Sequence, residues 1–480
     1  MLFSSLSFIF IFLPLFLAAY YLTPERYRNV TLLVASLIFY GIGEPRYIVL
    51  FVFSLVLNYA LYRAMVHRRH MTNVRRQGST VVTRTAEPAI PGSEKALLAL
   101  TVVFNVAMLF FFKYFGFVLE NVRAATKTTG AEITVLLPLG ISFYTFQILS
   151  FQIDRYRGEI KEPVSFVEFS TYVAMFPQLI AGPIVRYGEV GDEMKHRRVG
   201  LANIEEGLMD FSVGLGLKVL LANQLGTLWT NIAEGGGDVS TPVAWLGVFA
   251  YSMQLYFDFW GYSVMAIGLA KLMGFYVPEN FDIPYESRSV SEFWRRWHMT
   301  MGRFFRLYVY FPLGGSRCGL PRTILNLLVV WALTGFWHGA DWNFLIWGLT
   351  FFVLLTVEKT GLGKWLEKTR VLGHVIIILL IPATWMIFAI TDLPVLSSYL
   401  KAMIGISSAT GHAGAMFLRL LKTYWWLLLI GVFFCTHIPR DFYRKHKNNL
   451  LVKAALLVCF IASAILIEKG SSNPFLYFRF

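Results

Sequence analysis

The sequence predicts an all-α polytopic integral membrane protein. Of its 480 residues, 56% are hydrophobic and only 15% are charged, and the mean hydropathy is +0.56. A soluble chain carries about 25% charged residues. Apolar runs recur from Ser5 to Ile467, which leaves no room for a large soluble domain. We therefore expect one membrane domain over residues 1–480.

The apolar runs define the expected helices, because a spanning helix needs about 20 apolar residues. The candidate segments are 5–22, 30–43, 46–66, 96–118, 134–152, 164–184, 243–273, 324–356, 372–391, 423–438 and 450–468, with a mixed helix at 202–232. Several are short or interrupted by Pro and Gly. We therefore expect re-entrant or interfacial helices beside the spans, since irregular backbone at membrane depth needs protein or a wet cavity around it.

Basic residues predict the orientation of the chain, because cytoplasmic loops carry an excess of Lys and Arg. The loop 67–95 holds six Lys and Arg residues against two Glu residues, which places it in the cytoplasm and the N-terminus outside. A second basic group, from Arg440 to Lys453, precedes the last apolar run and places the tail 471–480 outside. Two termini outside require an even number of spans, and about 12 fits the pattern.

The net charge of +14 fits loops of this kind and contact with anionic lipid head groups. Nucleic-acid binding is excluded as a reading, because the basic residues flank apolar runs and form no soluble basic module. The three cysteines, Cys318, Cys435 and Cys459, are scattered and show neither a disulfide framework nor zinc spacing. We expect no metal and no bound cofactor.

The stretch 279–315 differs from its surroundings because arginines and aromatic residues alternate in it. It is typical of an interfacial amphipathic helix or a folded loop on the cytoplasmic side. Arg295 and Arg296 could bind the phosphates of a nucleotide-bearing cosubstrate through charge-assisted hydrogen bonds. They could equally anchor the segment to anionic lipid. Trp297 lies beside them as a candidate supporting residue.

His338 is the leading catalytic candidate. It lies in an apolar run between Gly335 and Gly339, and a histidine at membrane depth usually faces a cavity or a partner rather than lipid. A neutral imidazole can take a proton from a hydroxyl group and so activate it as a nucleophile. The alternative is a core histidine bonded to a neighbouring carbonyl. Trp337, directly before it, is a candidate supporting residue.

His298 is the second catalytic candidate, and it ends the run SEFWRRWH at 291–298. It could orient the substrate, assist the base or bind the carrier of the acyl group. It could also be an interfacial histidine held by neighbouring Trp and Arg residues. A metal pair with His338 is weak, because zinc normally needs three or four protein ligands and no third candidate has suitable spacing.

Two further positions inside apolar runs point to a lined cavity. Asp258 lies in FDFWGYS at 257–263, and an intramembrane carboxylate needs a partner, so it pairs with an arginine or orients a histidine. Gln178 lies where the helical pattern breaks twice, at Pro177 and at Gly182-Pro183. Such a break suits a cavity lining, and a plain kink is the alternative.

The chain ends in PFLYFRF at 474–480. Aromatic residues at a membrane exit usually form an interfacial belt. Tyr477 could instead meet a partner or accept an acyl group.

Taken together, these motifs resemble the membrane-bound O-acyltransferase family, in the bacterial branch that includes the alginate and peptidoglycan O-acetyltransferase membrane subunits. The likeness runs through nearly the whole chain and includes PLGISFY at 138–144, DRYRG at 154–158, LIAGP at 179–183, FDFWGYS at 257–263, SEFWRRWH at 291–298 and WHG at 337–339. SEFWRRWH followed by WHG is the most specific feature. Trp260 is a small departure, because Ser is common there.

The resemblance implies a ring of tilted helices around a central funnel or tunnel, with His338 where the family places its catalytic histidine. It implies a multi-pass protein of the bacterial cytoplasmic (inner) membrane that takes an acyl group from a cytoplasmic thioester, here acetyl-CoA as cosubstrate. It also implies that Tyr477 relays the group to an extracytoplasmic partner of the SGNH esterase or transferase type, which acetylates an envelope polysaccharide.

Other functions stay open at this point. Within the family, the alternative is a D-alanyl transfer protein for teichoic acid. Outside it, a non-enzymatic transporter for a lipid-linked sugar has similar topology and charge but needs no general base. A scaffold that recruits an export complex would need neither histidine.

Overall fold

The computed structural model describes residues 2–77, 92–128, 135–180, 182–233, 239–363, 369–406, 413–470 and 475–476. The described residues form helices and connecting loops without any strand, which confirms the predicted all-α fold. The chain divides into two compact units. Unit 1 is mainly residues 10–199 with 274–277, and unit 2 is residues 2–9, 200–273 and 278–480. The single membrane domain over residues 1–480 stays a prediction.

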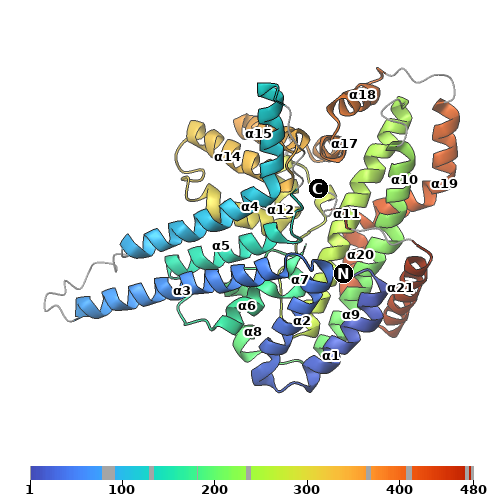
Figure 1. The fold of residues 1–480 in the computed structure, drawn as a ribbon. Coiled ribbons are helices and arrows are strands. Elements are labelled where there is room, and N and C mark those ends of the chain that lie inside the picture. The colour runs from blue at the N-terminus through green and yellow to red at the C-terminus, as the bar shows by residue number, and fades with distance from the viewer. Residues whose placement is uncertain are drawn as a thin grey trace. The chain divides into compact units, whose positions relative to one another are not determined.

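In unit 1, the π-helical stretch η1 (Phe8–Phe12) leads into α1 (Leu13–Leu22). There follow η2 (Glu25–Tyr27), α2 (Arg28–Gly43), α3 (Ile48–Gln77), α4 (Gly92–Thr126), α5 (Ile141–Arg157), α6 (Phe166–Ala174), α7 (Phe176–Leu179) and α8 (Tyr187–His196). The helices α3, α4 and α5 lie side by side (Figure 1). Buried polar groups fix this packing, because Asn105 donates to Asn58 at 2.7 Å between α4 and α3.

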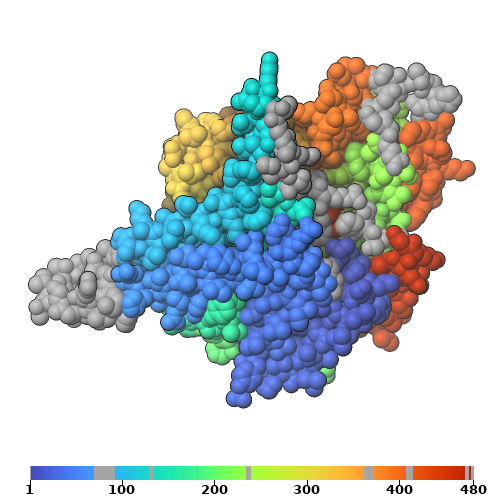
Figure 2. Space-filling model, viewed as in Figure 1, coloured from blue at the N-terminus to red at the C-terminus, as the bar shows by residue number. Residues whose placement is uncertain are grey.

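The outer faces of α3 and α4 carry exposed apolar side chains, among them Phe53, Val103 and Phe110. Figure 2 shows the two helices as adjoining blue surfaces. Single exposed apolar residues are ordinary, but extended apolar helix faces fit a lipid environment. Both helices are long and apolar enough to cross a membrane.

The expected segment 164–184 is two short helices rather than one. The helix α6 ends at Ala174, and α7 begins at Phe176 with Pro177 in its first turn. Proline lacks the N–H that a continuing helix would use, so the chain breaks there. Gly182 then returns so close that an added Cβ would lie 2.5 Å from the Pro177 carbonyl oxygen, which requires glycine at that position.

Unit 2 holds the remaining elements. In chain order they are α9 (Leu201–Gly216), η3 (Leu217–Ala222), α10 (Asn223–Ala233), α11 (Thr241–Leu272), η4 (Pro284–Glu286), α12 (Val290–Arg296), α13 (Met299–Phe305), η5 (Arg306–Tyr310), α14 (Leu320–His338), α15 (Trp342–Val357), η6 (Glu358–Leu362), α17 (Arg370–Ala389), α18 (Leu393–Met403), α19 (Ala413–Phe434), α20 (His437–His446) and α21 (Leu450–Glu468).

The centre of unit 2 is α11, which is buried on most sides and packs against α9. Two glycine pairs let the backbones approach. A Cβ at Gly214 would lie 2.5 Å from the Gly261 carbonyl oxygen, and one at Gly207 would lie 2.8 Å from the Gly268 carbonyl oxygen. Small residues of this kind are the usual contact between membrane helices, because they allow close van der Waals packing.

The expected single run 324–356 is wrong, since the structure divides it into α14 and α15. The division falls at Gly339, whose backbone is extended, and Asp341 begins α15 as its N-cap. The two helices then pack together closely, because a Cβ at Gly335 would lie 2.5 Å from the Phe344 carbonyl oxygen. The turn carries His338, Asp341 and Asn343, but this polar interruption is too short for hydropathy alone to reveal it.

Eight helices among the described residues are long and apolar enough to cross a membrane. They are 48–69, 92–126, 201–233, 320–338, 342–361, 371–389, 414–434 and 450–468. The chain is therefore a multi-pass membrane protein, while the expected count of about 12 spans is not confirmed. Although α11 has 32 residues, polar side chains such as Gln254 and Asp258 interrupt its apolar sequence.

Candidate active site

His338 is the last residue of α14, where the chain turns at Gly339. Its ring packs almost perpendicular to Trp347 of α15, at 5.1 Å between ring centroids, and to Phe388 of α17, at 5.2 Å. Gly339 cannot carry a side chain, because a Cβ there would collide with the Phe344 ring. The helix end and three packed helices thus fix the imidazole in one place.

His338 lines a small cavity of about 30 Å³ in unit 2. The other lining residues are Leu255, Phe259, Trp297, Trp347, Trp385, Phe388, Phe475 and Leu476. This space is about the size of one water molecule. The lining is aromatic and apolar, so His338 is the ionisable side chain among the residues that surround it. The expectation that His338 faces a cavity is met by this geometry.

His298 is 1% exposed and lies between α12 and α13 in the left-handed backbone region, at φ 45°. Its Nδ1 lies 3.1 Å from Asn280 Oδ1. The same oxygen accepts the Thr300 backbone N–H at 3.2 Å and the Thr300 hydroxyl at 2.9 Å. Because a backbone N–H can only donate, this Asn280 atom is an acceptor, and His298 Nδ1 carries the proton.

The opposite ring nitrogen of His298 is therefore the one with a lone pair. Nε2 is buried and has no hydrogen-bond partner among the described residues. Burial lowers the pKa of His298 to about 3, so the ring is neutral at physiological pH. His298 thus offers a fixed hydrogen-bond acceptor within an apolar surrounding.

Trp337 connects the two histidines. Its ring lies 6.0 Å from the His298 ring and 4.8 Å from the His338 ring. Trp297 belongs to the same cluster, since it stacks on Phe293 at 5.5 Å and contacts Trp385 at 5.0 Å. The fold thus gathers His298, Trp297, Trp337 and His338, although the two histidines are 40 positions apart in the sequence.

Asp258 is buried in the middle of α11 and pairs with Lys218 of η3, not with an arginine or a histidine. Its second oxygen, Oδ2, accepts the backbone N–H of Leu476 at 2.8 Å. Sequence reasoning missed Lys218, whose only signal was a single basic residue inside the mixed helix 202–232. It also missed Asn280, a polar residue in a loop.

The two arginines lie on α12 and are not among the residues that line the cavity, although Trp297, which follows Arg296, is. Arg296 pairs with Glu292 one helical turn earlier, at 2.7 Å, whereas Arg295 is exposed. Gln178 is buried in α7 of unit 1, where its amide donates to the Tyr172 carbonyl oxygen. Tyr477 lies outside the described residues, as does part of the basic loop 67–95.

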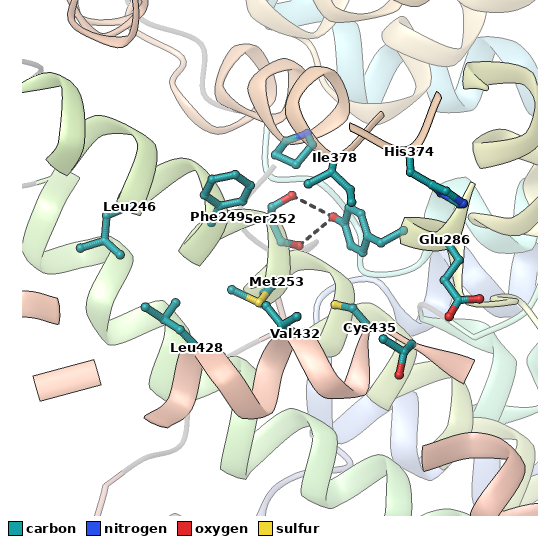
Figure 3. A pocket seen from close by; sticks show the side chains of 13 residues that line it. Leu246, Phe249, Ser252, Met253, Glu286, His374, Ile378, Leu428, Val432 and Cys435 are labelled. Atoms are coloured by element: carbon teal, nitrogen blue, oxygen red, sulfur yellow. Dashed lines mark hydrogen bonds between the residues drawn. The ribbon is translucent and has the colours of Figure 1, made fainter. Parts of the chain in front are cut away.

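A second cavity, of about 400 Å³, lies nearby in unit 2 (Figure 3). Side chains of α11, α17 and α19 line it, including Phe249, Ile378 and Leu428. Tyr285 also lines it and donates to the Ser252 carbonyl oxygen at 3.0 Å. The Tyr285 ring lies 6.4 Å from Trp297, which lines the small cavity. These two aromatic side chains therefore lie between the small and the large cavity. This space suits a hydrocarbon chain.

Among the described residues, no cluster of His, Cys, Asp and Glu is placed to hold a metal ion. Zinc normally needs at least three protein ligands, more than the two histidines of this cluster could supply.

Comparison with known proteins gives a consistent answer. Residues 93–400 match the model of the membrane-bound O-acyltransferase family. The chain is 36% identical to a protein of Azotobacter vinelandii described as a probable alginate O-acetylase, over 100% of both chains. It is 30% identical to a peptidoglycan O-acetyltransferase of Helicobacter pylori, over 100% of this chain and 98% of the relative.

A more limited match is a teichoic acid D-alanyltransferase of Streptococcus thermophilus, which is 30% identical over 49% of this chain and 59% of the relative. The full-length likeness is therefore to O-acetyl-transferring proteins, and the match to the D-alanyl-transferring protein is confined to about half of the chain. Both the family model and the full-length relatives name acyl transfer. The chain belongs to the membrane-bound O-acyltransferase family and is an O-acyltransferase.

Proposed function

We propose that this O-acyltransferase takes an acetyl group from cytoplasmic acetyl-CoA and delivers it outside for O-acetylation of a polysaccharide. One observation carries the proposal: His338 and the C-terminal residues Phe475 and Leu476 line the same cavity. We therefore infer that Tyr477, the next residue in the sequence, comes within reach of His338 as the base. The full-length relatives, named for alginate and peptidoglycan, support the polysaccharide acceptor.

In the proposed reaction, His338 acts as the general base. It takes the proton from the Tyr477 hydroxyl while the phenol oxygen bonds to the thioester carbonyl carbon. The carbon–sulfur bond then breaks, CoA leaves as a thiolate on the cytoplasmic side, and the tyrosine carries the acetyl ester. A second transfer gives the acetyl group to an extracytoplasmic SGNH-type partner, which releases the tyrosine hydroxyl.

His298 positions the donor in this scheme. Its neutral ring offers Nε2 as an acceptor, which suits an amide N–H of the pantetheine arm of acetyl-CoA. Trp337 lies against both histidines and aligns donor and base. The exposed Arg295 is better placed than Arg296 to meet the phosphates of CoA, because Glu292 already pairs with Arg296. Gln178 is buried in unit 1, and a supporting role for it stays a prediction.

The size of the cavity favours a short acyl group. Large aromatic side chains surround His338 and leave about 30 Å³, so a long chain would have to displace them. Trp347 adds a buried indole N–H that has no acceptor among the described residues. A donor of this kind beside the base would stabilise the negative oxygen that forms when the thioester is attacked.

The location of the reaction follows from topology. A cytoplasmic donor and an external acceptor require a protein of the bacterial inner membrane, with the basic loop 67–95 inside and both termini outside. The tail 471–480 then reaches the partner from the outer side. A D-alanyl donor is also small, so the choice of donor has to be tested directly.

The test incubates purified protein in detergent with radiolabelled acetyl-CoA. Wild type should gain label on the tail and release CoA, whereas His338→Ala should do neither. Tyr477→Phe should lose the label. His446→Ala is the matched control, because that histidine is half-buried on α20, is not among the residues that line the cavity, and hydrogen-bonds the Phe442 carbonyl oxygen.

Each outcome decides between mechanisms. CoA release that needs His338 but not Tyr477 would keep the enzyme and move the acceptor to another hydroxyl. Full activity in His338→Ala would refute the base assignment. Labelling from a D-alanyl carrier, with none from acetyl-CoA, would select the D-alanyl alternative.

A further inference from the structure

The ion pair between Lys218 and Asp258 has no part in the chemistry proposed above, yet it is the most buried pair among the described residues. The two side chains are 2% and 3% exposed. Removing both charges from water is costly, and the mutual attraction offsets this only with additional hydrogen bonds. Ionisable residues within membrane segments usually mark a function. The pair therefore needs an explanation beyond helix packing.

Helix packing does not require this pair. The helices α9 and α11 already meet through the glycine contacts at Gly214–Gly261 and Gly207–Gly268. They also share a second pair, Lys271–Asp210, at 2.7 Å, whose side chains are 21% and 16% exposed. Replacing a buried pair by apolar residues of similar size is often neutral or stabilising. Stability alone would not favour the charges at this place.

What distinguishes Asp258 is its second contact. Lys218 Nζ bonds Oδ1 of the carboxylate and also donates to Asn223 Oδ1 at 3.4 Å, and Oδ2 accepts the Leu476 backbone N–H at 2.8 Å. Phe475 continues the contact along α11, stacking on Tyr262 at 5.0 Å and lying 5.5 Å from Phe259. Phe475 is 2% exposed and Leu476 is 6% exposed, so both are seated inside the protein.

We propose that Lys218 and Asp258 form a binding site for the C-terminal segment of this same chain. Lys218 holds one carboxylate oxygen, which turns the other toward the tail backbone. Tyr262 and Phe259 supply the apolar surface beneath Phe475. The binding of the tail stands on its own contacts. That it presents Tyr477 to His338 rests on the proposed function, and in that role Lys218 and Asp258 are positioning residues.

Asp258 binds a backbone N–H of the tail, so this polar contact does not depend on the side chain at position 476. A carboxylate that accepts a main-chain N–H forms a charge-assisted bond of the stronger kind. This bond fixes the position of Leu476 along the axis of α11. The ring contacts with Tyr262 and Phe259 fix the face of α11 on which Phe475 lies. A shift of one residue would move Phe475 off Tyr262, so the two contacts together define the register in which Phe475 and Leu476 lie along α11.

The test uses the full-length protein and the double variant Lys218→Met/Asp258→Leu, which leaves no unpaired charge. Carboxypeptidase trimming is followed by intact mass. In wild type the trimming should stop before Phe475 and Leu476 are lost, because Asp258 and Tyr262 hold these two residues. The double variant should be trimmed through Phe475 roughly tenfold faster, the effect of losing a hydrogen bond to a charged group. Trimming at the wild-type rate would overturn the proposal.

The matched control is Lys271→Met/Asp210→Leu, which removes another ion pair of α11, this one with α9 rather than η3, that does not touch Phe475 or Leu476. It should be trimmed like wild type. Equal acceleration in both double variants would mean general loosening of unit 2 and would also overturn the proposal. Lys218→Met/Asp258→Asn serves if the first variant does not fold: the shape at position 258 is kept and both charges are lost, so trimming should again be faster than in wild type.

The same proteins separate this proposal from the relay. If the double variant frees the tail and wild type carries no acetyl group on Tyr477, the binding site stands and the relay fails. If both hold, the double variant should show a lower kcat with an unchanged KM for acetyl-CoA, since the tail rather than the donor site is disturbed. A general structural defect would change both.

Discussion

His298 and His338 carry the same side chain within one aromatic cluster, yet their surroundings differ. His298 is sealed, with one ring nitrogen bonded to Asn280, and it is held in a left-handed backbone conformation. His338 is half-buried at a helix end and borders a cavity. A sealed, neutral imidazole can bind and orient a group. An imidazole that borders a space can exchange a proton with what enters it.

The largest effect should follow from removing the proposed base. In His338→Gln the side chain keeps polar atoms at the end of α14 but cannot accept a proton at neutral pH. We expect kcat for acetyl transfer to fall by about 10²- to 10⁴-fold, the usual contribution of a general base. Stopped-flow detection of free CoA measures this. Activity within a few-fold of wild type would remove the distinction between the two histidines.

The sealed position of His298 should show in the acid stability of the protein. Its pKa of about 3 in the folded protein lies below the ordinary 6.5, so the unfolded chain binds a proton that the folded one excludes. Stability from this group is complete above about pH 6.5 and falls as the pH drops toward about 3. At about pH 5 we expect a loss of about 2 kcal/mol relative to neutral pH.

Thermal unfolding of wild type beside His298→Asn isolates this effect. Asparagine tolerates the left-handed backbone better than most residues and does not titrate, so the variant keeps the local conformation. The stability difference between the two proteins should shift by about 2 kcal/mol in favour of the variant on acidification to about pH 5. An identical pH response in both would show that His298 is accessible to protons in the folded state.

The sequence identifies the two candidate catalytic histidines of this site better than the residues that hold the site in place. His338 is identifiable because a histidine between glycines stands out in an apolar run, and His298 because it ends an Arg-Trp cluster. Asn280 and Lys218 are common polar residues whose partners lie 18 and 40 positions away. Contacts between residues so far apart in the sequence depend on how α11 packs. The local sequence pattern therefore does not predict them.

The same reasoning explains the helix boundaries. Segments such as 450–468 were predicted closely, because their ends coincide with charged or polar residues. The turn at Gly339 is not predicted, because only a short polar interruption, with Asp341 as the N-cap of α15, separates two long apolar sequences. The seat of Phe475 and Leu476 beside Asp258 was also unforeseen, because an aromatic tail reads equally well as an interfacial belt.

At neutral pH, the loss of His298 should affect the binding of the acetyl donor more than the stability of the protein. His298→Asn removes Nε2, and with it one hydrogen bond to the donor. We expect KM for acetyl-CoA to rise by about tenfold while kcat falls little, since one neutral hydrogen bond is worth about 1 kcal/mol and slightly more when buried. Steady-state kinetics gives both constants. A loss confined to kcat would place His298 in the chemical step beside His338.

The smallest expected effect compares the two neighbouring arginines on α12. Arg295 is exposed, so it can reach the phosphates of CoA, whereas Arg296 is already paired with Glu292. Arg295→Gln should raise KM for acetyl-CoA by about three- to tenfold, with the difference shrinking at high salt because exposed charges are screened. Arg296→Gln is the matched control and should change KM less.

Equal effects would mean that total charge on this helix, not a specific contact, attracts the donor. Equal KM in both variants and wild type would instead assign these arginines to lipid, in which case their loss should lower binding to anionic vesicles.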